Sequence, residues 1–233
     1  MCEAADLIAT QQIRNVATIA GDLSQEKRCW FFRSALPCYK NGGASCPCYA
    51  VMGDNRHHAI MGAGRCAAPC VADLAPALTS LDATVIVHGP DGSRRIPMLD
   101  FYKWSGETTV SAQEIISAIE VPIVTGATQA YEKYSQWRGD FPEASAGVRL
   151  VWSGDRLSSA QISLGGVSPL PMRALYAERS LISEKSITDE IILSAASKVV
   201  YGSLPLRDNK SKVDMIVAVT ARALRRARDA HFK

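Results

Sequence analysis

The distribution of cysteine constrains this chain more than any other feature of its sequence. Six of the seven cysteines fall between Cys29 and Cys70, in a segment rich in Gly, Pro and Asn that has neither helical nor strand periodicity. An irregular segment of roughly 40 residues is uncommon in a compact domain unless something else organises it. The crowded thiols suggest that a bound inorganic centre does so.

The spacing of the thiols leaves the nature of that centre open. It runs Cys29-x8-Cys38-x7-Cys46-x-Cys48-x17-Cys66-x3-Cys70. Four thiolates that converge on one point hold an iron–sulfur cluster, because soft sulfur ligands match iron. The absence of C-x2-C excludes a ferredoxin run and a zinc ribbon. An iron–sulfur cluster, a zinc ion and unliganded thiols remain as alternatives; His57 and His58 are possible extra ligands, although two half-exposed loop histidines are the simpler interpretation.

Composition excludes several classes of protein. At 233 residues, 47% hydrophobic and 21% charged, the chain is typical of a globular protein with one large or two small domains. Its net charge of +3 gives no argument for nucleic acid as a partner, and no apolar run approaches the roughly 18 residues of a membrane span. The first ten residues do not resemble a signal peptide, and the odd number of cysteines argues against a disulfide framework. We therefore expect a reduced, cytoplasmic setting.

Periodicity predicts a mixed fold in the first half of the chain. Apolar residues at helical spacing predict helices over residues 3–12 and 73–81. Between them, Thr18, Ala20 and Gly21 predict a turn whose small residues let backbone N–H groups approach a ligand, although an ordinary structural turn would look the same. Strands are predicted over 83–88 and 93–97 about a Gly-Pro-Asp-Gly turn, followed by an ordered segment over 111–120.

The second half begins after a boundary at residues 124–128. A loosely alternating segment over 130–137 precedes a hairpin, with strands at 148–152 and 157–164 joined by Ser-Gly-Asp-Arg. Two helices follow, one capped by Thr188 and ending at Gly202, the other over 211–230. Strands followed by helices predict an α+β fold rather than a doubly wound sheet.

Several motifs, taken in order, resemble one family. Residues 13–23, Ile-Arg-Asn-Val-Ala-Thr-Ile-Ala-Gly-Asp-Leu, resemble the IRNxxTxGGNL signature of the FAD-binding (medium) subunit of molybdenum hydroxylases, the xanthine dehydrogenase, aldehyde oxidoreductase and carbon monoxide dehydrogenase group. Residues 164–173 resemble its LGGVxPxPxRA stretch, and residues 204–213 resemble PLxDNxYK. Residues 28–33, Cys38, residues 53–62, Cys66 and residues 73–78 resemble the branch that carries an extra [4Fe-4S] cluster, as in bacterial aldehyde oxidoreductases and 4-hydroxybenzoyl-CoA reductase.

The resemblance implies a domain organisation. Residues 1–123 would form the second half of a PCMH-type FAD-binding domain, with an iron–sulfur insertion at about 24–72. Residues 127–233 would form the C-terminal antiparallel sheet and helices of the flavoprotein subunit. The family's preceding subdomain, with its A-G-G-T type loop for the FAD diphosphate, has no counterpart in the sequence. We therefore expect a gene fragment or one half of a split subunit.

The resemblance also assigns flavin contacts. Thr18, Ile19, Ala20, Gly21 and Asp22 match the turn that contacts the flavin and its phosphates. Asp73 matches an acidic residue near FAD, Ile116 an apolar residue beside the isoalloxazine ring, and Lys133 a basic residue at the flavin edge. Without the resemblance, Asp73 would be a helix N-cap, Lys133 an exposed strand lysine and Ile116 a core residue.

Two of these positions depart from the family pattern. Ala20 stands where the family has a second glycine, which matters if the backbone φ is positive. Asp22 stands where the family has asparagine, and its carboxylate would approach phosphate or ring oxygens unless it faces away.

The resemblance assigns the metal ligands as well. Cys29, Cys38, one of Cys46 or Cys48, and Cys66 match the four cluster ligands. Counting back from residues 53–55 favours Cys48, whereas counting forward from Cys38 favours Cys46. Cys70 lies outside the matched set.

The implied function is electron transfer. The chain would pass electrons from molybdenum and iron–sulfur centres to FAD and an external acceptor, in a complex with a large molybdenum-cofactor subunit and a small [2Fe-2S] subunit. We expect a cytoplasmic location, with export on a partner's signal as the alternative. The alternative is a truncated, non-catalytic remnant: a metal-stabilised domain that binds the sister subunits but no flavin.

Overall fold

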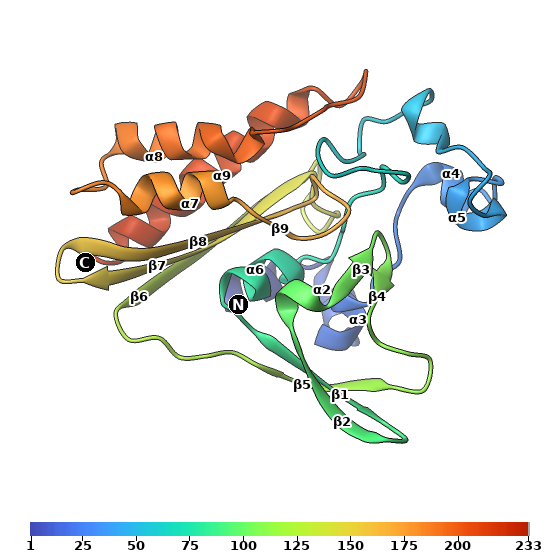
Figure 1. Cartoon of the computed structure of the whole chain (residues 1–233), viewed down its shortest axis with the longest axis horizontal. Helices are drawn as coiled ribbons and strands as arrows, with labels where there is room; N and C mark the ends of the chain where they lie inside the picture. Colours follow the sequence, from blue (N-terminus) through green and yellow to red (C-terminus); the bar gives the residue numbers. More distant parts are fainter. Residues whose placement is uncertain (233) are drawn as a thin grey trace.

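Two antiparallel sheets organise the chain. The computed structural model describes residues 1–232, and the strand pairs in this range all run antiparallel. Helices cover the larger sheet, while the smaller sheet lies at the opposite end of the molecule (Figure 1). The α+β prediction is confirmed.

The larger sheet belongs to the second half of the chain. Its strand order is β6-β7-β8-β9, and helices α7, α8 and α9 lie together on one of its faces (Figure 1). The predicted hairpin is confirmed, and Thr188 caps α8 with its Oγ1 3.4 Å from the Ile191 N–H. The bounds are β6 (Ala127–Tyr134), β7 (Ala144–Ser153), β8 (Arg156–Gly165), β9 (Met172–Arg173), α7 (Leu175–Ile182), α8 (Asp189–Ser197), the 3-10 helix η3 (Lys198–Val200) and α9 (Ser211–Asp229).

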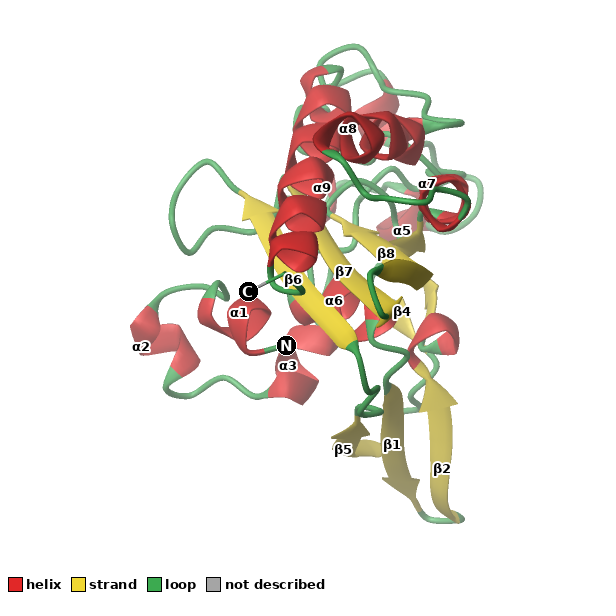
Figure 2. Cartoon of the chain, turned by 90° about the vertical axis from the view of Figure 1, so that its left-hand side faces the viewer, coloured by secondary structure: helices red, strands yellow, loops and turns green. Residues whose placement is uncertain are grey.

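Strand β7 is buried on both faces. Successive residues along it are buried although their side chains point to opposite faces, because α9 packs on one face and α6 (Leu74–Ser80) on the other. The approach of α6 is close enough that a Cβ on Gly147 would lie 2.7 Å from the Pro76 carbonyl oxygen. Glycine in β7 therefore lets the helix of the first half rest directly on the sheet of the second (Figure 2).

The smaller sheet has the order β2-β1-β5. The hairpin of β1 (Thr84–Gly89) and β2 (Gly92–Pro97) confirms the predicted strand pair, and the ordered segment before residue 120 is strand β5 (Ile115–Glu120). The connection between β2 and β5 contains the 3-10 helix η2 (Met98–Asp100) and a two-stranded ribbon of β3 (Tyr102–Trp104) and β4 (Glu107–Thr108).

The predicted N-terminal helix over residues 3–12 is wrong. The segment forms two short helices, α1 (Cys2–Asp6) and α2 (Gln11–Arg14), and Ala9 between them has φ 42°. The guanidinium of Arg14 donates to the carbonyls of Ile8 (2.8 Å) and Ala9 (3.0 Å), which the break leaves without helical partners. The Arg14 side chain thus stabilises a break that the local apolar periodicity does not reveal.

The predicted turn at Gly21 is also wrong. It is a short helix, α3 (Ile19–Leu23), and Thr18 is its N-cap, with Oγ1 accepting from the Gly21 N–H at 2.9 Å. Threonine satisfies one of the free N–H groups at a helix start, which explains why the segment coils here.

The cysteine-rich segment over residues 24–72 is mostly loop. It contains α4 (Trp30–Arg33), α5 (Tyr39–Gly42) and the 3-10 helix η1 (Tyr49–Val51), and it extends from one end of the molecule (Figure 1). Buried Asn55 ties it to the loop before α9 by accepting from the Asp208 N–H at 2.9 Å. Asn209 from that loop donates in return to the His58 carbonyl at 3.1 Å.

Within residues 1–232, none of the helices combines the length and the apolar character needed to cross a bilayer.

Candidate functional site

Four cysteines from separate parts of the irregular segment line one small cavity: Cys29, Cys38, Cys48 and Cys66. Three of them precede a short helix directly, since they are the N-cap residues of α4, α5 and η1. None of the seven cysteines forms a disulfide. The helix starts therefore carry sulfur atoms from distant points of the chain to a common cavity.

The walls of this cavity are aromatic and cationic. Phe31, Phe32, Tyr39 and Tyr49 line it together with three basic side chains, Lys27, Lys40 and Arg65. The Lys27 ammonium is 2% exposed and lies 4.3 Å from the centroid of the Phe32 ring. Positive charge at a low-dielectric site with several thiolates is what an anionic metal centre requires.

The charges of the thiols respond to this setting. Burial raises the pKa of the Cys29 thiol; the nearby N–H groups of Phe32 and Phe31 oppose that shift, while Cys48 and Cys66 add to it. Burial likewise raises the pKa of Cys66, and Cys48 adds to the shift whereas Lys27 opposes it. Cys48 therefore disfavours the charged form of both Cys29 and Cys66.

Cys46 and Cys70 lie apart from the cavity. The Cys46 thiol donates to the Gly42 carbonyl at 3.3 Å, and Cys46 does not line the cavity. Cys70 is buried in the hydrophobic core beneath α6, where burial raises the pKa of its thiol to about 12. Of the two cysteines that the sequence left as alternatives, the structure brings Cys48 to the other three.

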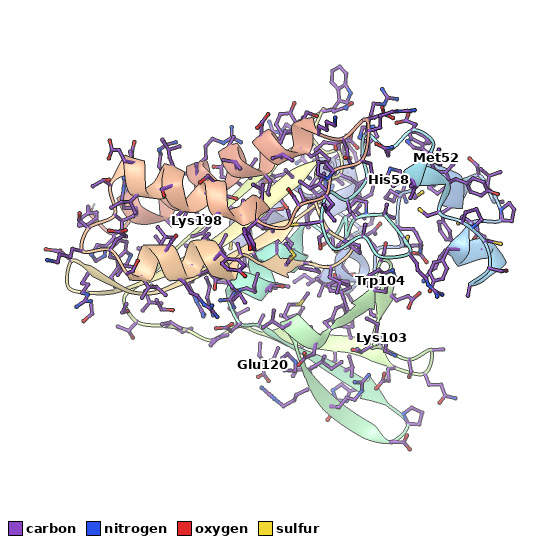
Figure 3. All side chains as sticks on the ribbon, turned by 45° about the horizontal axis from the view of Figure 1, so that its top comes forward. Met52, His58, Lys103, Trp104, Glu120 and Lys198 are labelled. Carbon is purple, nitrogen blue, oxygen red and sulfur yellow. The ribbon has the colours of Figure 1, made fainter. Side chains whose placement is uncertain are left out.

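His58 is the buried neighbour of Cys29. It lies beside the cysteine-rich segment (Figure 3), its Nε2 is 3.2 Å from the Cys29 Sγ, and it is only 2% exposed. Burial lowers the pKa of His58 to about 4, and the charge of Lys212 adds to the shift. The interpretation of both histidines as half-exposed loop residues is therefore wrong for His58.

His57 points the other way, and its Nδ1 is hydrogen-bonded to the Glu143 carboxylate. The second oxygen of Glu143 lies 3.5 Å from the Nζ of Lys212, a side chain only 1% exposed. Burial lowers the pKa of Lys212 to about 8, and Glu143 opposes the shift. Lys212 also donates to the carbonyls of Gly166 (2.7 Å) and His57 (3.4 Å), so α9 holds the backbone of the histidine segment.

A larger cleft of about 630 Å³ opens on the far side of Cys29. Its lining includes Arg28, Trp30, His58, Trp137 and Phe141, and the Arg28 guanidinium lies 4.8 Å from the centroid of the Phe141 ring. None of the predicted flavin-contacting residues lines this cleft. Cys29 borders both cavities, so the thiol site has one wall in common with the cleft.

The predicted flavin-contacting helix α3 has an exposed side and a buried side. Thr18, Ile19 and Gly21 are exposed, and Ala20 is half-buried with an ordinary negative φ, so alanine brings no backbone strain there. Asp22 turns inward: its carboxylate accepts from the N–H groups of Leu74 (2.9 Å) and Asp73 (3.3 Å). Burial raises the pKa of Asp22. The Asp22 carboxylate thus caps α6 and does not face a ligand.

Asp73 and Lys133 are paired with each other. Lys133 Nζ donates to Asp73 Oδ2 at 2.8 Å and to the Leu7 carbonyl at 2.9 Å, and the Tyr131 hydroxyl donates to Asp73 Oδ1 at 3.4 Å. The Asp73 side chain makes no capping bond, and Lys133 is buried rather than exposed. Asp73 does occupy the N-cap position of α6, but its carboxylate binds Lys133 across 60 residues instead of capping the helix. The interpretation of Lys133 as an exposed strand lysine is wrong.

Ile116 lies on β5 opposite Val87 and is half-buried against the hydrophobic cluster around α6. Reasoning from the sequence missed Lys27 and Tyr131, and it named His58 only as a possible extra metal ligand. Only the position of His58 within the motif at residues 53–62 was a usable signal; Lys27 and Tyr131 look like ordinary loop and strand residues.

Two family models cover nearly the whole chain. Residues 1–124 match the FAD binding domain in molybdopterin dehydrogenase, and residues 129–228 match the CO dehydrogenase flavoprotein C-terminal domain. Among curated proteins, the chain is similar to the aldehyde oxidoreductase FAD-binding subunit PaoB of Escherichia coli, with 34% identity over 196 residues, covering 80% of this chain and 60% of that protein. It is also similar to the carbon monoxide dehydrogenase medium chain of Hydrogenophaga pseudoflava, with 25% identity over 99% of this chain and 66% of the relative.

Solved structures give the same result. Carbon monoxide dehydrogenase from Hydrogenophaga pseudoflava superimposes with a TM-score of 0.72 at 26% identity, over 98% of this chain and 66% of that chain. Quinoline 2-oxidoreductase from Pseudomonas putida 86 has a TM-score of 0.73 at 20% identity, over 99% of this chain and 67% of that one, and supports the fold alone. The chain spans between about half and two thirds of the curated relatives it matches. With a family model over more than half of its residues, this chain belongs to the family of FAD-binding medium subunits of the molybdenum hydroxylases.

Proposed function

We propose that the chain is the electron-transfer flavoprotein part of a molybdenum-dependent hydroxylase or dehydrogenase, and that it binds a [4Fe-4S] cluster as well as FAD. The observation that carries the proposal is the convergence of Cys29, Cys38, Cys48 and Cys66 on one cavity. A segment that binds no metal centre would not need four unpaired thiols from separate loops at one cavity.

The donor set fits a cluster better than a single ion. Among residues 1–232, no three His, Cys, Asp or Glu side chains are close enough together to hold one metal ion. A cluster of four irons separates its thiolates farther than one zinc ion does, since each thiolate binds a different iron. Of the basic side chains at the cavity, Lys27 is paired with Glu26 and Lys40 with Glu107, so Arg65 would contribute most of the charge that balances such a centre.

The flavin would lie against the exposed side of α3. FAD, when bound, supplies a centre that accepts and releases one or two electrons. Thr18, Ile19, Ala20 and Gly21 would contact it, and small residues there allow close approach to the backbone. We retain Asp73, Ile116 and Lys133 as flavin neighbours, with Asp73 and Lys133 acting as a buried ion pair. We assign Asp22 a structural role, because its carboxylate holds α3 against α6.

The proposed partners follow from the names of the relatives. Carbon monoxide dehydrogenase and glyceraldehyde dehydrogenase each have a medium chain, which indicates an assembly with larger and smaller chains. We propose a large subunit with the molybdenum cofactor and a small subunit with [2Fe-2S] clusters. Electrons would arrive from these centres and leave to an external acceptor.

One observation favours the alternative, a metal-stabilised domain that binds its sister subunits without flavin. Asp22, Asp73 and Lys133, three of the eight predicted flavin residues, are engaged with other protein groups. Under that alternative the cysteine site would serve folding alone.

Chemical analysis of the anaerobically purified full chain distinguishes these functions. Four iron and four acid-labile sulfide per chain, with bound flavin in the visible spectrum, is the expected result. Iron and sulfide without flavin, even after incubation with FAD, would establish the metal-stabilised alternative. Zinc in a colourless protein would overturn the cluster.

A further inference from the structure

We propose that His58 is a positioning residue for the iron–sulfur centre: its Nε2–H donates a hydrogen bond to the Cys29 sulfur, which orients this ligand and raises the reduction potential of the cluster. The inference rests on the proposed function, because it concerns the same four-cysteine site. It goes further by naming a residue outside the ligand set that tunes the centre.

The geometry restricts how His58 can act. Nε2 lies 3.2 Å from Cys29 Sγ, and Nδ1 is buried with no hydrogen-bond partner among the described residues. A thiolate sulfur has lone pairs and no proton, so the nitrogen that faces it must be the donor. The Nε2–H tautomer therefore places the proton between the ring and the sulfur and leaves Nδ1 as a buried acceptor without a partner. The other tautomer would bury an unpaired Nδ1–H donor, which costs more free energy.

The imidazole ring is held where it can do this. Asn209 donates to the carbonyls of His58 (3.1 Å) and Ala59 (3.2 Å), which fixes the backbone of His58 to the loop before α9. The Phe31 ring centroid lies 6.3 Å from that of His58, and the ring is 2% exposed. An imidazole fixed in this way orients its ligand without ligating the metal itself.

Cys29 is the ligand at which such a bond matters most. Its residue borders both the thiol cavity and the 630 Å³ cleft. Hydrogen bonds to cluster sulfurs and limited exposure to solvent are both established determinants of cluster potential. A donor at this sulfur stabilises the reduced cluster, because that state carries more negative charge. Cys29 is also the ligand that lines the larger cleft.

The first test is a redox titration of the holoprotein, followed by electron paramagnetic resonance, on the wild type, His58→Leu and His88→Leu. Loss of one hydrogen bond to a charged sulfur is expected to shift the ratio of reduced to oxidised cluster about tenfold toward oxidised, a potential lower by about 59 mV for one electron. His88→Leu makes the same chemical change at an exposed site on β1 and should leave the potential unchanged. His58→Leu with four irons and the wild-type potential would overturn the inference.

A second measurement is made first on the wild-type protein, so it is informative even if His58→Leu does not fold. In wild-type protein labelled with ¹⁵N-histidine, the reduced cluster should show a weak nitrogen coupling in pulsed electron paramagnetic resonance. The same coupling should be absent from His58→Gln and present in His88→Leu. No coupling in the wild type, or one as strong as that of a direct ligand, would overturn the role of His58. Wild-type protein without four irons would instead mean that the proposed cluster itself fails, an outcome seen before any potential is measured.

Discussion

The ammonium of Lys133 and the carboxylate of Asp73 lie 2.8 Å apart, and their side chains are only 3% and 4% exposed. Lys133 belongs to β6 of the larger sheet, whereas Asp73 directly precedes α6 of the first half. The two halves of the chain thus share a buried ion pair. In such a pair, removal of one member leaves the other charge buried and uncompensated.

At about pH 8, where Asp73 is ionised, Lys133→Met should therefore lower the free energy of unfolding by about 3–5 kcal/mol, measured by urea denaturation. Lys103→Met is the matched control, because Lys103 is exposed on β3, and it should change stability by no more than about 0.5 kcal/mol. Equal, small effects of the two substitutions would mean that water reaches the Asp73–Lys133 pair.

Asp73 should also make stability depend on pH. Burial raises its pKa from 3.8 to about 7; Lys133 and Tyr131 on β6 oppose the shift, and Asp22 on α3 adds to it. The folded state then binds a proton more tightly than the unfolded state. Its contribution to stability is complete below about pH 4 and is lost as the pH rises toward 7.

The measurement is the free energy of unfolding of wild type and Asp73→Asn at several values between those limits. Relative to Asp73→Asn, the wild type should lose stability as the pH rises through this window, because the asparagine side chain does not titrate. Parallel curves for the two proteins would contradict the raised pKa.

Asp22 caps α6 from 51 and 52 residues away, by accepting from the N–H groups of Asp73 and Leu74. Asp22→Ala should cost about 1–2 kcal/mol, because it leaves two N–H groups at the helix start without an acceptor. Asp22→Asn keeps an oxygen acceptor and should recover most of that loss. Asp100→Ala, at an exposed position, is the control for loss of a carboxylate elsewhere. If Asp22→Asn were as destabilising as Asp22→Ala, the charge rather than the capping oxygen would matter.

Local signals predict most of the second half of the chain, although helix α7 and the short strand β9 were not predicted. The hairpin of β7 and β8, the Thr188 cap of α8 and the extent of α9 all depend on residues a few positions apart. Such features are fixed by turn chemistry and apolar periodicity, which the sequence displays directly.

The first half depends on partners that lie far away in sequence. Helix α1 ends early, and its Glu3 carboxylate accepts from the Tyr131 N–H at 3.0 Å and pairs with Arg226, which periodicity over residues 3–12 cannot reveal. The inward turn of Asp22 depends on α6 in the same way. The burial of His58 arises because residues near 209 cover its segment. The candidate cysteines could be named from the sequence, but the choice between Cys46 and Cys48 needs the cavity in three dimensions.

That choice can be tested with two neighbouring substitutions. Cys48 lines the cavity with three other thiols, whereas the Cys46 thiol donates to the Gly42 carbonyl at 3.3 Å. Cys48→Ser should lose most of the iron of the anaerobically purified protein, since a hydroxyl is a poor replacement for a soft thiolate ligand. Cys46→Ser should retain four irons per chain and the wild-type electron paramagnetic resonance spectrum, because its hydroxyl can still donate to Gly42. Loss of iron from Cys46→Ser with retention in Cys48→Ser would reverse the ligand assignment; equal retention in both would mean that the cluster binds fewer cysteines than the cavity presents.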